Sequence, residues 1–450
     1  MSNDQNASQE PQGQKPEGNK KPLSRRQVLN TAALGAGALA LGGCSSGGSR
    51  TVTMFSNPRG YMSGQAINVK PGRKVLGAND RIVMAIIGAG GMGRGHMNNF
   101  KEQGGMEWAA VCDVYEPNLK AGLDIAGSNA KGYNNHEEVL ERQDIDAVLI
   151  ASPEHWHHHH LIDTVRAGKD AYCEKPMCWS VQEGADMVNE VRKTDRIVQI
   201  GMQRRSSPII HKIKEEVFDS KMLGDIYLAR AEWYWNMDVN RDENLPGTLD
   251  WPRFCGPAGP QEFKPIKFRH WRYFWPFSGG NETDQGTHLM DVVQWMMGAD
   301  QPLAATQTGE VYRNKPTETP DTFCCAFEYP NFMATWTLGY TTNTWRNGWS
   351  ICFQGTKGAL FLTEAGYRVF NQVNGWEGGW PKPVKEELPG SVTSTVPHIK
   401  NFLQCVRERK QPNAPVEIGH KAVRPLHLAN AALKAGRRAV LAEDGVTIRL

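Results

Sequence analysis

The feature that most constrains the fold of this chain is a short apolar run that ends in a cluster of glycines. Residues 82–87 (IVMAII) suit a parallel strand buried on both faces, and residues 88–93 (GAGGMG) follow before a helix-compatible stretch. Glycine is required at such a turn because a Cβ would block a pyrophosphate, and the following helix N-terminus offers free N–H groups to that anion. We therefore predict dinucleotide contacts at Gly88, Gly90, Gly91, Met92 and Gly93.

A second apolar strand, over residues 108–112, ends at Asp113. Asp113 lies 20 residues beyond Gly93, where a carboxylate typically binds the adenosine ribose hydroxyls. The same carboxylate would repel a 2′-phosphate, so the pattern favours NAD over NADP. The alternative is that Asp113 caps the helix that follows it.

Two further apolar strands, at residues 146–150 and 171–173, each lead into a loop. Alternating strands and helices predict a doubly wound parallel sheet, an α/β fold that binds ligands at the carboxyl ends of its strands. We expect the following residues of these loops to contact the cofactor: Ser152, Pro153, His157, Glu174 and Lys175.

Four histidines stand in a row at residues 157–160. Consecutive residues of a helix point in different directions, so the four cannot all bind one metal ion. We expect one or two of them to face the cofactor and the others to be solvated, and we expect no metal.

Three motifs occur in order along the chain: the glycine turn at residue 88, Glu174–Pro176 (EKP) and residues 284–288 (DQGTH). Together they resemble the Gfo/Idh/MocA family of NAD(P)-dependent oxidoreductases, over about residues 80–450. The resemblance implies an N-terminal Rossmann domain and a C-terminal α/β domain on an open, mostly antiparallel sheet. It also implies a sugar, polyol or related substrate, and it assigns catalytic or substrate roles to Lys175, Asp284 and His288.

The chemistry of these three side chains supports the same roles. Hydride transfer from a carbinol carbon requires a base within hydrogen-bond reach of the hydroxyl group. Lys175 leaves the sheet at its ligand-binding edge, where it suits proton handling or carbonyl polarisation. Asp284 and His288 are four residues apart and share a helix face, so His288 could be the base and Asp284 its orienting partner or a ligand of a substrate hydroxyl.

Each of these readings has an alternative. Lys175 could be an ordinary surface lysine, and Asp284 with His288 could be a helix-face hydrogen bond. Asp284, His288 and Asp291 are spaced by four and three residues, so they could also hold a metal ion with one more distant ligand.

The pattern changes from residue 201 onwards. Arg204 and Arg205 follow the last Rossmann strand and could bind substrate or form structural ion pairs. A Trp- and Pro-rich stretch at residues 236–283 is too long for a plain loop and predicts a lid or wall beside the pocket. Trp271 within it could stack on a sugar ring, although most such rings pack in the core.

The remaining residues predict an antiparallel sheet followed by two helices. Residues 322–340 alternate in two runs around a central turn, and residues 355–358 turn a second hairpin. Helices are expected at residues 397–408 and 426–441. An open sheet face needs a cover, so we expect a homo-oligomer, either a dimer or a tetramer.

The N-terminal residues 1–44 predict an export signal. After a polar leader come Ser24–Arg26 and a 13-residue Ala- and Gly-rich segment that is too short to span a bilayer. The paired arginines resemble a twin-arginine signal. Residues 41–44 resemble a lipobox, in which Cys44 would be acylated and tether the chain to the membrane, and ordinary cleavage nearby is the alternative. We expect a periplasmic or lipid-anchored location at the cell envelope.

Four segments follow from these patterns: the leader and signal at residues 1–44, a linker or arm at 45–80, a Rossmann domain at 81–200, and a substrate and oligomerisation domain at 201–450. Residues 1–50 hold six basic and three acidic side chains, which leaves 45 of 51 basic and 45 of 48 acidic residues for the body. A neutral body argues against nucleic-acid binding.

An exported enzyme is not expected to find free NAD outside the inner membrane, so it would carry and regenerate its own cofactor. We expect an oxidoreductase that transfers a hydride between bound NAD(P) and a CH–OH or keto carbon of a sugar or polyol. The first alternative is a redox-neutral, NAD-dependent glycoside hydrolase that oxidises, eliminates and re-reduces. The alternative from another class is a non-catalytic sugar-binding lipoprotein.

Overall fold

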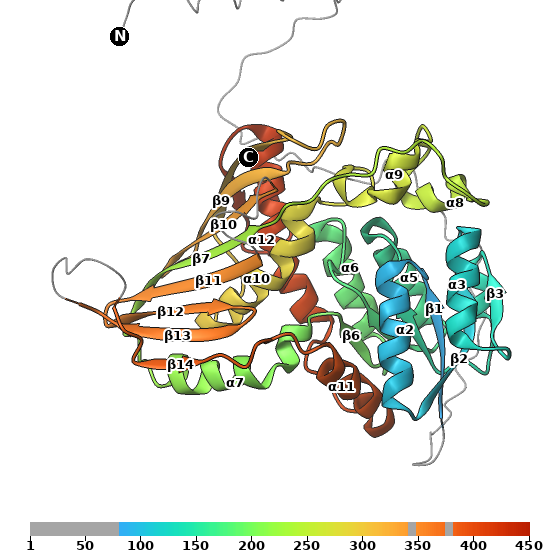
Figure 1. The fold of residues 1–450 in the computed structure, drawn as a ribbon, viewed down its shortest axis with the longest axis horizontal. Helices are drawn as coiled ribbons and strands as arrows, with labels where there is room; N and C mark the ends of the chain where they lie inside the picture. The colour runs from blue at the N-terminus through green and yellow to red at the C-terminus, as the bar shows by residue number, and fades with distance from the viewer. Residues whose placement is uncertain (1–80, 341–347, 374–380) are drawn as a thin grey trace, which may run out of the picture. The chain divides into compact units, whose positions relative to one another are not determined.

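The computed structural model describes residues 81–340, 348–373 and 381–450 of the chain (Figure 1). The predicted twin-arginine signal, Cys44 and the arm at residues 45–80 lie outside these residues. None of the helices in the described part is long and apolar enough to cross a membrane.

The first sheet has six parallel strands in the order β3-β2-β1-β4-β5-β6. Its strands and the helices around them are β1 (Ile82–Ile87), α2 (Gly91–Gln103), β2 (Met106–Cys112), α3 (Glu116–Ala126), β3 (Lys131–Tyr133), α4 (His136–Leu140), β4 (Ala147–Ile150), α5 (Glu154–Arg166), β5 (Asp170–Cys173), α6 (Val181–Arg192) and β6 (Val198–Ile200). The strand order reverses between β1 and β4, which creates a crevice at their carboxyl ends. The predicted doubly wound parallel sheet is therefore confirmed.

Strand β1 shows why a continuous apolar run forms the centre of this sheet. Met84 and Ile86 join one hydrophobic cluster together with Phe100 of α2. Ile87 points the other way and joins a second cluster with Leu161 of α5. Successive side chains of a strand alternate between its faces, so a strand that is covered on both sides must be apolar at every position.

The second sheet has ten strands, in the order β14-β13-β12-β11-β7-β10-β9-β8-β15-β16, among the described residues. They are β7 (Ile226–Tyr234), β8 (Ala304–Glu310), β9 (Thr322–Glu328), β10 (Met333–Gly339), β11 (Gly348–Gly355), β12 (Gly358–Thr363), β13 (Gly366–Asn371), β14 (Lys385–Glu387), β15 (Ala439–Leu441) and β16 (Ile448–Arg449). All neighbours are antiparallel except β7 and β10. Both predicted hairpins are present, as the pairs β9–β10 and β11–β12.

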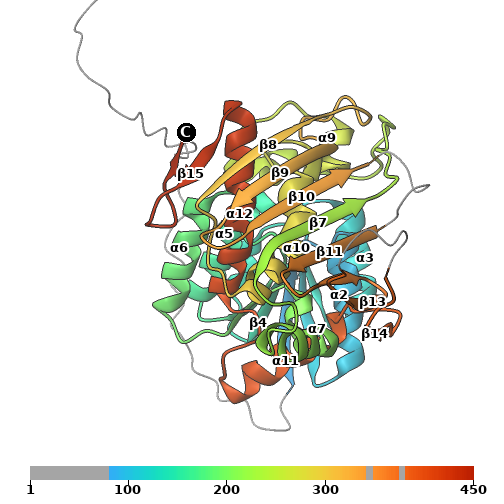
Figure 2. The same cartoon turned by 90° about the vertical axis from the view of Figure 1, so that its left-hand side faces the viewer.

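Helices cover one face of this second sheet. The helical segments after β6 are η1 (Gln203–Ser206), α7 (Pro208–Ile213), η2 (Lys214–Asp219), α8 (Trp251–Cys255), η3 (Gly256–Ala258), α9 (Pro265–Arg269), η4 (Trp271–Tyr273), α10 (Asn281–Met297), α11 (Thr395–Glu408) and α12 (Val416–Ala435). Trp336 of β10 packs on the covered side with Leu289 of α10 and Leu426 of α12. Figure 2 looks onto the other side, where no described helix lies over β8, β9, β10 and β7. Cys324 of β9 is exposed on that open side.

The predicted helix at residues 426–441 is wrong in its bounds. Helix α12 begins ten residues earlier, at Val416, and it contains Pro425 within its length. It ends where Gly436 takes the left-handed conformation (φ 63°), as glycine commonly does after a helix. Residues 439–441 are instead strand β15, which pairs with β8.

The last two helices of the chain also complete the hydrophobic core of the first sheet. Ile399 and Phe402 of α11 belong to the same cluster as Phe100 and Tyr172. On the opposite face of that sheet, residues 414–423 join the cluster that contains β4 and α5. The core of the first sheet is thus completed by segments that follow it by about 200 residues in the sequence.

Candidate active site

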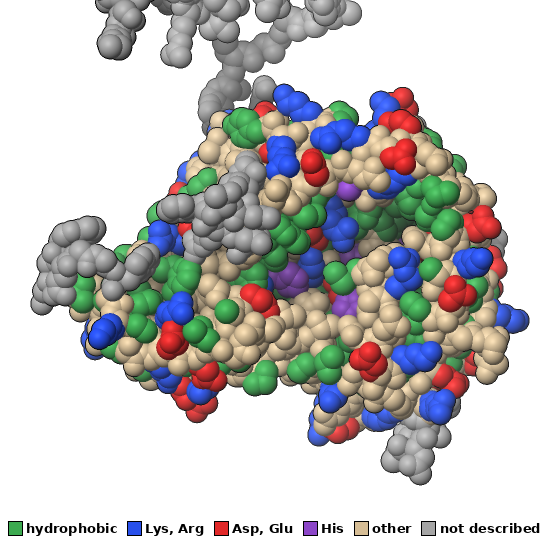
Figure 3. Space-filling view, in the orientation of Figure 1, with side chains coloured by type: hydrophobic (Ala, Val, Ile, Leu, Met, Phe, Trp, Pro, Cys, Tyr) green, Lys and Arg blue, Asp and Glu red, His purple; other side chains and the backbone are tan. Residues whose placement is uncertain are grey.

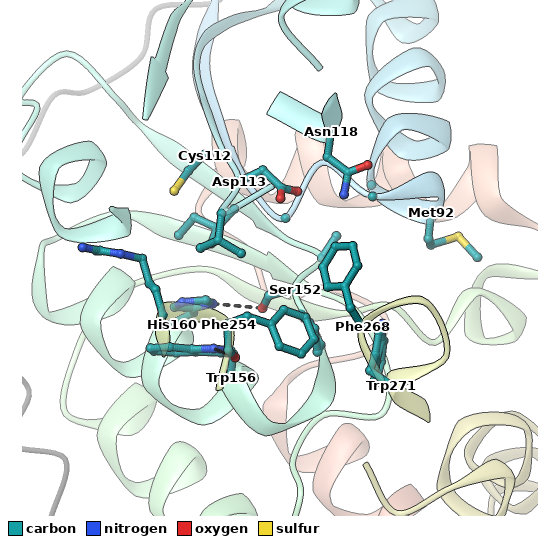
Figure 4. Close-up of a pocket in the computed structure, with 18 of the residues that line it drawn as sticks. Met92, Cys112, Asp113, Asn118, Ser152, Trp156, His160, Phe254, Phe268 and Trp271 are labelled. Carbon is teal, nitrogen blue, oxygen red and sulfur yellow. Dashed lines mark hydrogen bonds between the residues drawn. The ribbon is translucent and has the colours of Figure 1, made fainter. Parts of the chain in front are cut away.

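A cavity of about 270 Å³ opens at the carboxyl ends of the parallel strands (Figure 4). The glycine turn and Asp113 line one side of it, and residues 253–272 line the other. Figure 3 shows that this region is hollowed and that Lys, Arg and His side chains gather in it. The chain therefore has a pocket at the edge where the sequence predicts a dinucleotide.

The glycines of the turn divide into two kinds. A Cβ on Gly88 (φ +93°) would lie 2.6 Å from the Ser152 nitrogen, and one on Gly93 would lie 2.2 Å from the Gly88 oxygen, so both positions require glycine for packing. A Cβ on Gly90 or Gly91 would meet no protein atom within 4 Å. Both of these residues line the cavity, and no side chain caps the N-terminus of α2. The open space and the free N–H groups fit a pyrophosphate.

Asp113 lies at the end of β2 and lines the same cavity. Its carboxylate accepts hydrogen bonds from the N–H groups of Ala89 (2.8 Å) and Tyr115 (2.9 Å). Burial raises the pKa of Asp113 to about 6, although these two hydrogen bonds act to lower it. Helix α3 begins at Glu116 with Tyr115 at its cap position, so Asp113 is not the helix cap. Its position suits a ribose diol, and the Met92 side chain, 52% exposed, lines the cavity nearby.

The loop after β4 contributes Ser152 and Pro153 to the cavity lining. The Ser152 hydroxyl hydrogen-bonds with Nδ1 of His160 (2.9 Å), which is buried and also lines the cavity. His157 is buried, and its ring nitrogens lie 2.8 Å from the main-chain oxygen of Ser152 and 2.7 Å from the main-chain oxygen of Pro176. His157 thus connects the two loops instead of facing the cavity, so the expected cofactor contact of His157 is not seen. His160, by contrast, is one of the four histidines that does line the cavity.

Glu174 supports the site from behind and does not line the cavity. Its carboxylate is buried, lies 2.7 Å from Nε2 of His96 on α2, and accepts the N–H of Lys175 (3.2 Å). A Cβ on Gly201 would lie 2.5 Å from Glu174 Oε1, so the end of β6 must be glycine there. Glu174 therefore links β5 to the helix that follows the glycine turn.

Lys175 and Asp284 come together from opposite domains. Lys175 Nζ donates hydrogen bonds to Oδ1 (2.8 Å) and to the main-chain oxygen (3.0 Å) of Asp284. Arg272 Nε lies 3.4 Å from the same Oδ1 atom. Burial raises the pKa of Asp284, but the positive charges of Lys175 and Arg272 outweigh it and hold this pKa well below its usual range. The Lys175 side chain is 11% exposed, which excludes the surface-lysine alternative.

His288 follows Asp284 by one turn of α10. Burial lowers the pKa of His288 well below its usual value, and the charges on Lys175 and Arg204 lower it further while Asp284 opposes them. Its Nδ1 atom is buried and has no hydrogen-bond partner in the described part of the chain. The imidazole is therefore neutral near pH 7 and able to accept a proton.

Asp291 does not join Asp284 and His288 in a metal site. Arg205 Nε lies 3.0 Å from both carboxylate oxygens of Asp291, and the Arg205 guanidinium stacks on Trp295. Of the two roles considered for Arg205, substrate binding and a structural ion pair, the structure shows the ion pair. Among residues 81–340, 348–373 and 381–450, no group of three His, Cys, Asp or Glu side chains is placed to hold a metal ion.

The Trp- and Pro-rich stretch forms one wall of the cavity, as predicted. Leu249 pairs with Tyr115 in an isolated bridge, and the Phe254 oxygen lies 2.9 Å from ring nitrogens of both His155 and Trp156. These contacts fasten the stretch to the Rossmann domain. The residues that it contributes to the lining are Arg253, Phe254, Phe268, Arg269, Trp271 and Arg272.

Arg272 is one of the cavity-lining residues that the sequence alone does not single out. The Arg272 guanidinium stacks on the neighbouring Trp271, at 4.2 Å from the ring centroid, and both residues line the cavity. The aromatic residues dominate this stretch, and only the fold brings Arg272 to Asp284, twelve residues on. The signal available in the sequence is a basic residue between two aromatic residues.

Two family models match the chain in succession. Residues 82–202 match the NAD-binding Rossmann fold of an oxidoreductase family, and residues 220–441 match the C-terminal alpha/beta domain of the same family. Among solved structures, the WlbA dehydrogenase from Chromobacterium violaceum, in complex with NADH and UDP-GlcNAcA, has a TM-score of 0.64 and 22% identity. That likeness covers 82% of this chain and 98% of the other, and it shows the same fold.

Curated relatives match over a shorter length. The uncharacterized oxidoreductase YrbE of Bacillus subtilis is 27% identical over 49% of this chain and 55% of YrbE. A glycosyl hydrolase family 109 protein of Shewanella baltica is 27% identical over 38% of this chain and 41% of that protein. The chain thus spans about half the length of the curated relatives it matches. The two family models together cover most of the chain, which belongs to the Gfo/Idh/MocA family of NAD-binding oxidoreductases.

Proposed function

We propose that this protein oxidises a CH–OH group of a sugar or polyol, or reduces the corresponding ketone, with a hydride carried by bound NAD. The observation that carries the proposal is the Lys175–Asp284 ion pair, one helical turn before His288, which Arg272 connects to the cavity that the glycine turn lines. The WlbA structure, with NADH and a sugar nucleotide bound to the same fold, supports a carbohydrate substrate.

NAD supplies the acceptor for the hydride, and the side chains handle the hydroxyl proton. Lys175, fixed by two hydrogen bonds to Asp284, presents its ammonium group to the substrate oxygen and stabilises the negative charge that develops there. Neutral His288 accepts the hydroxyl proton on its imidazole ring. With bound NAD⁺ as the hydride acceptor, the hydroxyl proton would pass to His288, and the alcohol would become a ketone, aldehyde or lactone.

The test begins with the protein purified without added cofactor. Absorbance and mass spectra should show NAD or NADH bound to it, and a panel of sugars and polyols should change the absorbance of the reduced nicotinamide. Failure of every member to do so, at saturating NAD, would contradict a dehydrogenase. Retained turnover in Lys175→Met would contradict the role given to Lys175.

A redox-neutral glycoside hydrolase is the second candidate, and the glycosyl hydrolase family 109 relatives favour it. In that reaction a ring hydroxyl is oxidised, the neighbouring C–H is deprotonated, the glycosidic bond is eliminated, and the ketone is reduced again after water adds. Nitrophenyl glycosides distinguish the two: release of nitrophenol with no net change in NADH indicates hydrolysis. A sugar-binding lipoprotein would bind these ligands without converting any of them.

We also propose export to the cell envelope and assembly into a homo-oligomer. The paired Arg25 and Arg26 and the lipobox-like residues before Cys44 support the first, and the open face of the second sheet supports the second. The double substitution Arg25→Lys/Arg26→Lys should block export, so cell fractionation should find this variant in the cytoplasm. Cys44→Ser should release it from membranes, and light scattering should give at least a dimer.

A further inference from the structure

Arg204 carries a buried positive charge that no described group neutralises at contact distance. The residue is 6% exposed, and its guanidinium lies 3.9 Å from the centroid of the Trp349 ring. Its Nη1 atom is buried and has no hydrogen-bond partner within the described residues, and none of their carboxylates lies within 4 Å of it. A buried charge is costly unless it is paired and hydrogen-bonded, so this arginine lacks the partner that its position requires.

The half-buried Arg205 and the buried Arg424 do have partners for their Nη groups. Arg205, the next residue, forms a bidentate pair with Asp291. Arg424 is as deeply buried as Arg204, and its Nη1 and Nη2 donate to the Gln301 side chain (2.7 Å) and the Asp300 oxygen (2.9 Å). Arg204 is thus different from neighbours of the same type, in a chain that pairs buried guanidinium groups elsewhere.

Two contacts place Arg204 at the substrate end of the site. The Arg205–Asp291 pair fastens η1 to α10 at one turn beyond His288. Trp349, under the guanidinium, stands opposite Trp233 on the side of the second sheet that α10 covers. The positive charge of Arg204 also acts to lower the pKa of His288. Arg204 is not part of the cavity lining around Asp113, where the ribose would lie.

At this end of the site, cationic side chains outnumber the carboxylates that are in contact with them. Lys175 and Arg272 share the carboxylate of Asp284, and Arg205 binds that of Asp291. Glu364 and Asp291 act on Arg204 only from beyond contact distance. A single stacked guanidinium matches a planar monoanion, to which it donates two parallel hydrogen bonds.

We infer that the substrate carries a carboxylate and that Arg204 binds it, which makes the substrate an acidic sugar such as a hexuronate. This inference rests on the proposed function, because it names the class of sugar that the same site oxidises or reduces. The carboxylate would lie on the Trp349 side of the site, and the reacting hydroxyl group would lie between Lys175 and His288.

The experiment compares sugars that differ only in the group at C6. The NAD-loaded protein is assayed with D-glucuronate against D-glucose and with D-galacturonate against D-galactose, and the ratio of kcat/KM for acid over neutral sugar is measured. The ratio should exceed one in the wild type. In Arg204→Gln it should fall by about 30-fold or more, as expected when one partner of a buried charge pair is removed. Arg204→Lys should retain part of the preference, because the charge remains and the planar fork is lost.

Arg424→Gln is the matched control, since it removes a buried guanidinium that has protein partners and lies outside the site. It should leave the ratio unchanged. A wild-type ratio of one or below, or an equal loss for acid and neutral sugars in Arg204→Gln, would overturn the inference while the dehydrogenase remains.

A second readout does not depend on turnover. Calorimetric titration of the NADH-loaded protein with the same pairs should show tighter binding of the acid and loss of that difference in Arg204→Gln. Equal binding of both members would overturn the inference. Acid-specific binding with no redox change for any sugar would overturn the proposed function and leave the carboxylate site.

Discussion

The glycine turn at residues 88–93 and the charged cluster around Asp284 lie in the same active-site region and are built in different ways. The turn is a local object: consecutive residues supply the space, the free N–H groups and the helix end that an anion needs. The cluster takes Lys175 from a Rossmann loop, Arg272 from the aromatic wall and Asp284 from α10. The turn offers main-chain groups to a ligand, whereas the cluster offers side chains, and in it the charges of Lys175 and Arg272 lower the pKa of Asp284.

This difference predicts how each region responds to substitution. In the turn, an added Cβ should lower stability where it would meet protein atoms, and it should lower ligand affinity where it would enter open space of the cavity. In the cluster, removal of Lys175 or Arg272 raises the pKa of Asp284, because these two positive charges hold that pKa low. Binding of cofactor should therefore separate from turnover when the two regions are changed one at a time.

The largest separation is expected for Lys175→Met. Loss of the ammonium group removes the donor to the substrate oxygen and leaves Asp284 with one cationic neighbour, so kcat should fall by about 100-fold or more. Quenching of tryptophan fluorescence by NADH should give a dissociation constant close to that of the wild type. Comparable losses of kcat and of NADH affinity would show that the two regions are not independent.

The next test compares two glycines of the same turn. Gly93→Ala places a Cβ at 2.2 Å from the Gly88 oxygen, so the free energy of unfolding should fall by about 1–3 kcal/mol. Gly90→Ala meets no protein atom, so it should keep its stability and lose NAD affinity by about tenfold or more, because the methyl group takes pyrophosphate space. Urea unfolding and NADH titration measure the two effects. Unchanged affinity in Gly90→Ala would argue that the dinucleotide lies elsewhere.

A smaller effect is expected for Arg272→Gln. The substitution removes a guanidinium that lines the cavity beside Asp284, and kcat should fall by about tenfold at pH 7, less than for Lys175→Met. The loss should grow below about pH 5, because the pKa of Asp284 rises towards its usual range and the carboxyl begins to be protonated there. Arg241→Gln, in the same stretch but outside the cavity lining, is the control for kcat. A pH-independent loss would place Arg272 in substrate contact only.

The smallest effect concerns the pH dependence of cofactor binding. The pKa of Asp113 is raised to about 6, so its carboxyl is ionised above pH 6 and protonated below it. The ionised form is the better acceptor for ribose hydroxyls, so NAD affinity should rise by about fivefold as the pH passes upward through 6. Preference for NAD over NADP should rise with it, since the charge repels a 2′-phosphate. Titrations from pH 5 to 8 should show this step in the wild type and a flat profile in Asp113→Asn.

The two regions also differ in how far the sequence predicts them. The apolar run at residues 82–87, the glycine spacing and Asp113 are local patterns, and the structure places them around one cavity. Lys175, Asp284 and His288 lie in two short motifs, and their assignment to one site comes from the family resemblance. Arg272 and the Glu174–His96 contact depend on how distant segments pack, so no spacing announces them. The bounds of α12 are hidden for a related reason, because burial between two sheets overrides the weak helix signal around Pro425.

The packing of α11 and α12 against the first sheet has a consequence for the order in which the protein can mature. On the ribosome, the strands that cradle the nucleotide emerge long before residues 395–423, which seal both sides of that sheet. Until those residues are synthesised, Phe100, Tyr172 and their neighbours remain partly exposed to solvent, so the nascent chain is expected to bind chaperones. A truncated chain that stops after β6 should therefore be prone to aggregation, and the same fragment supplied with residues 395–435 in trans should regain solubility.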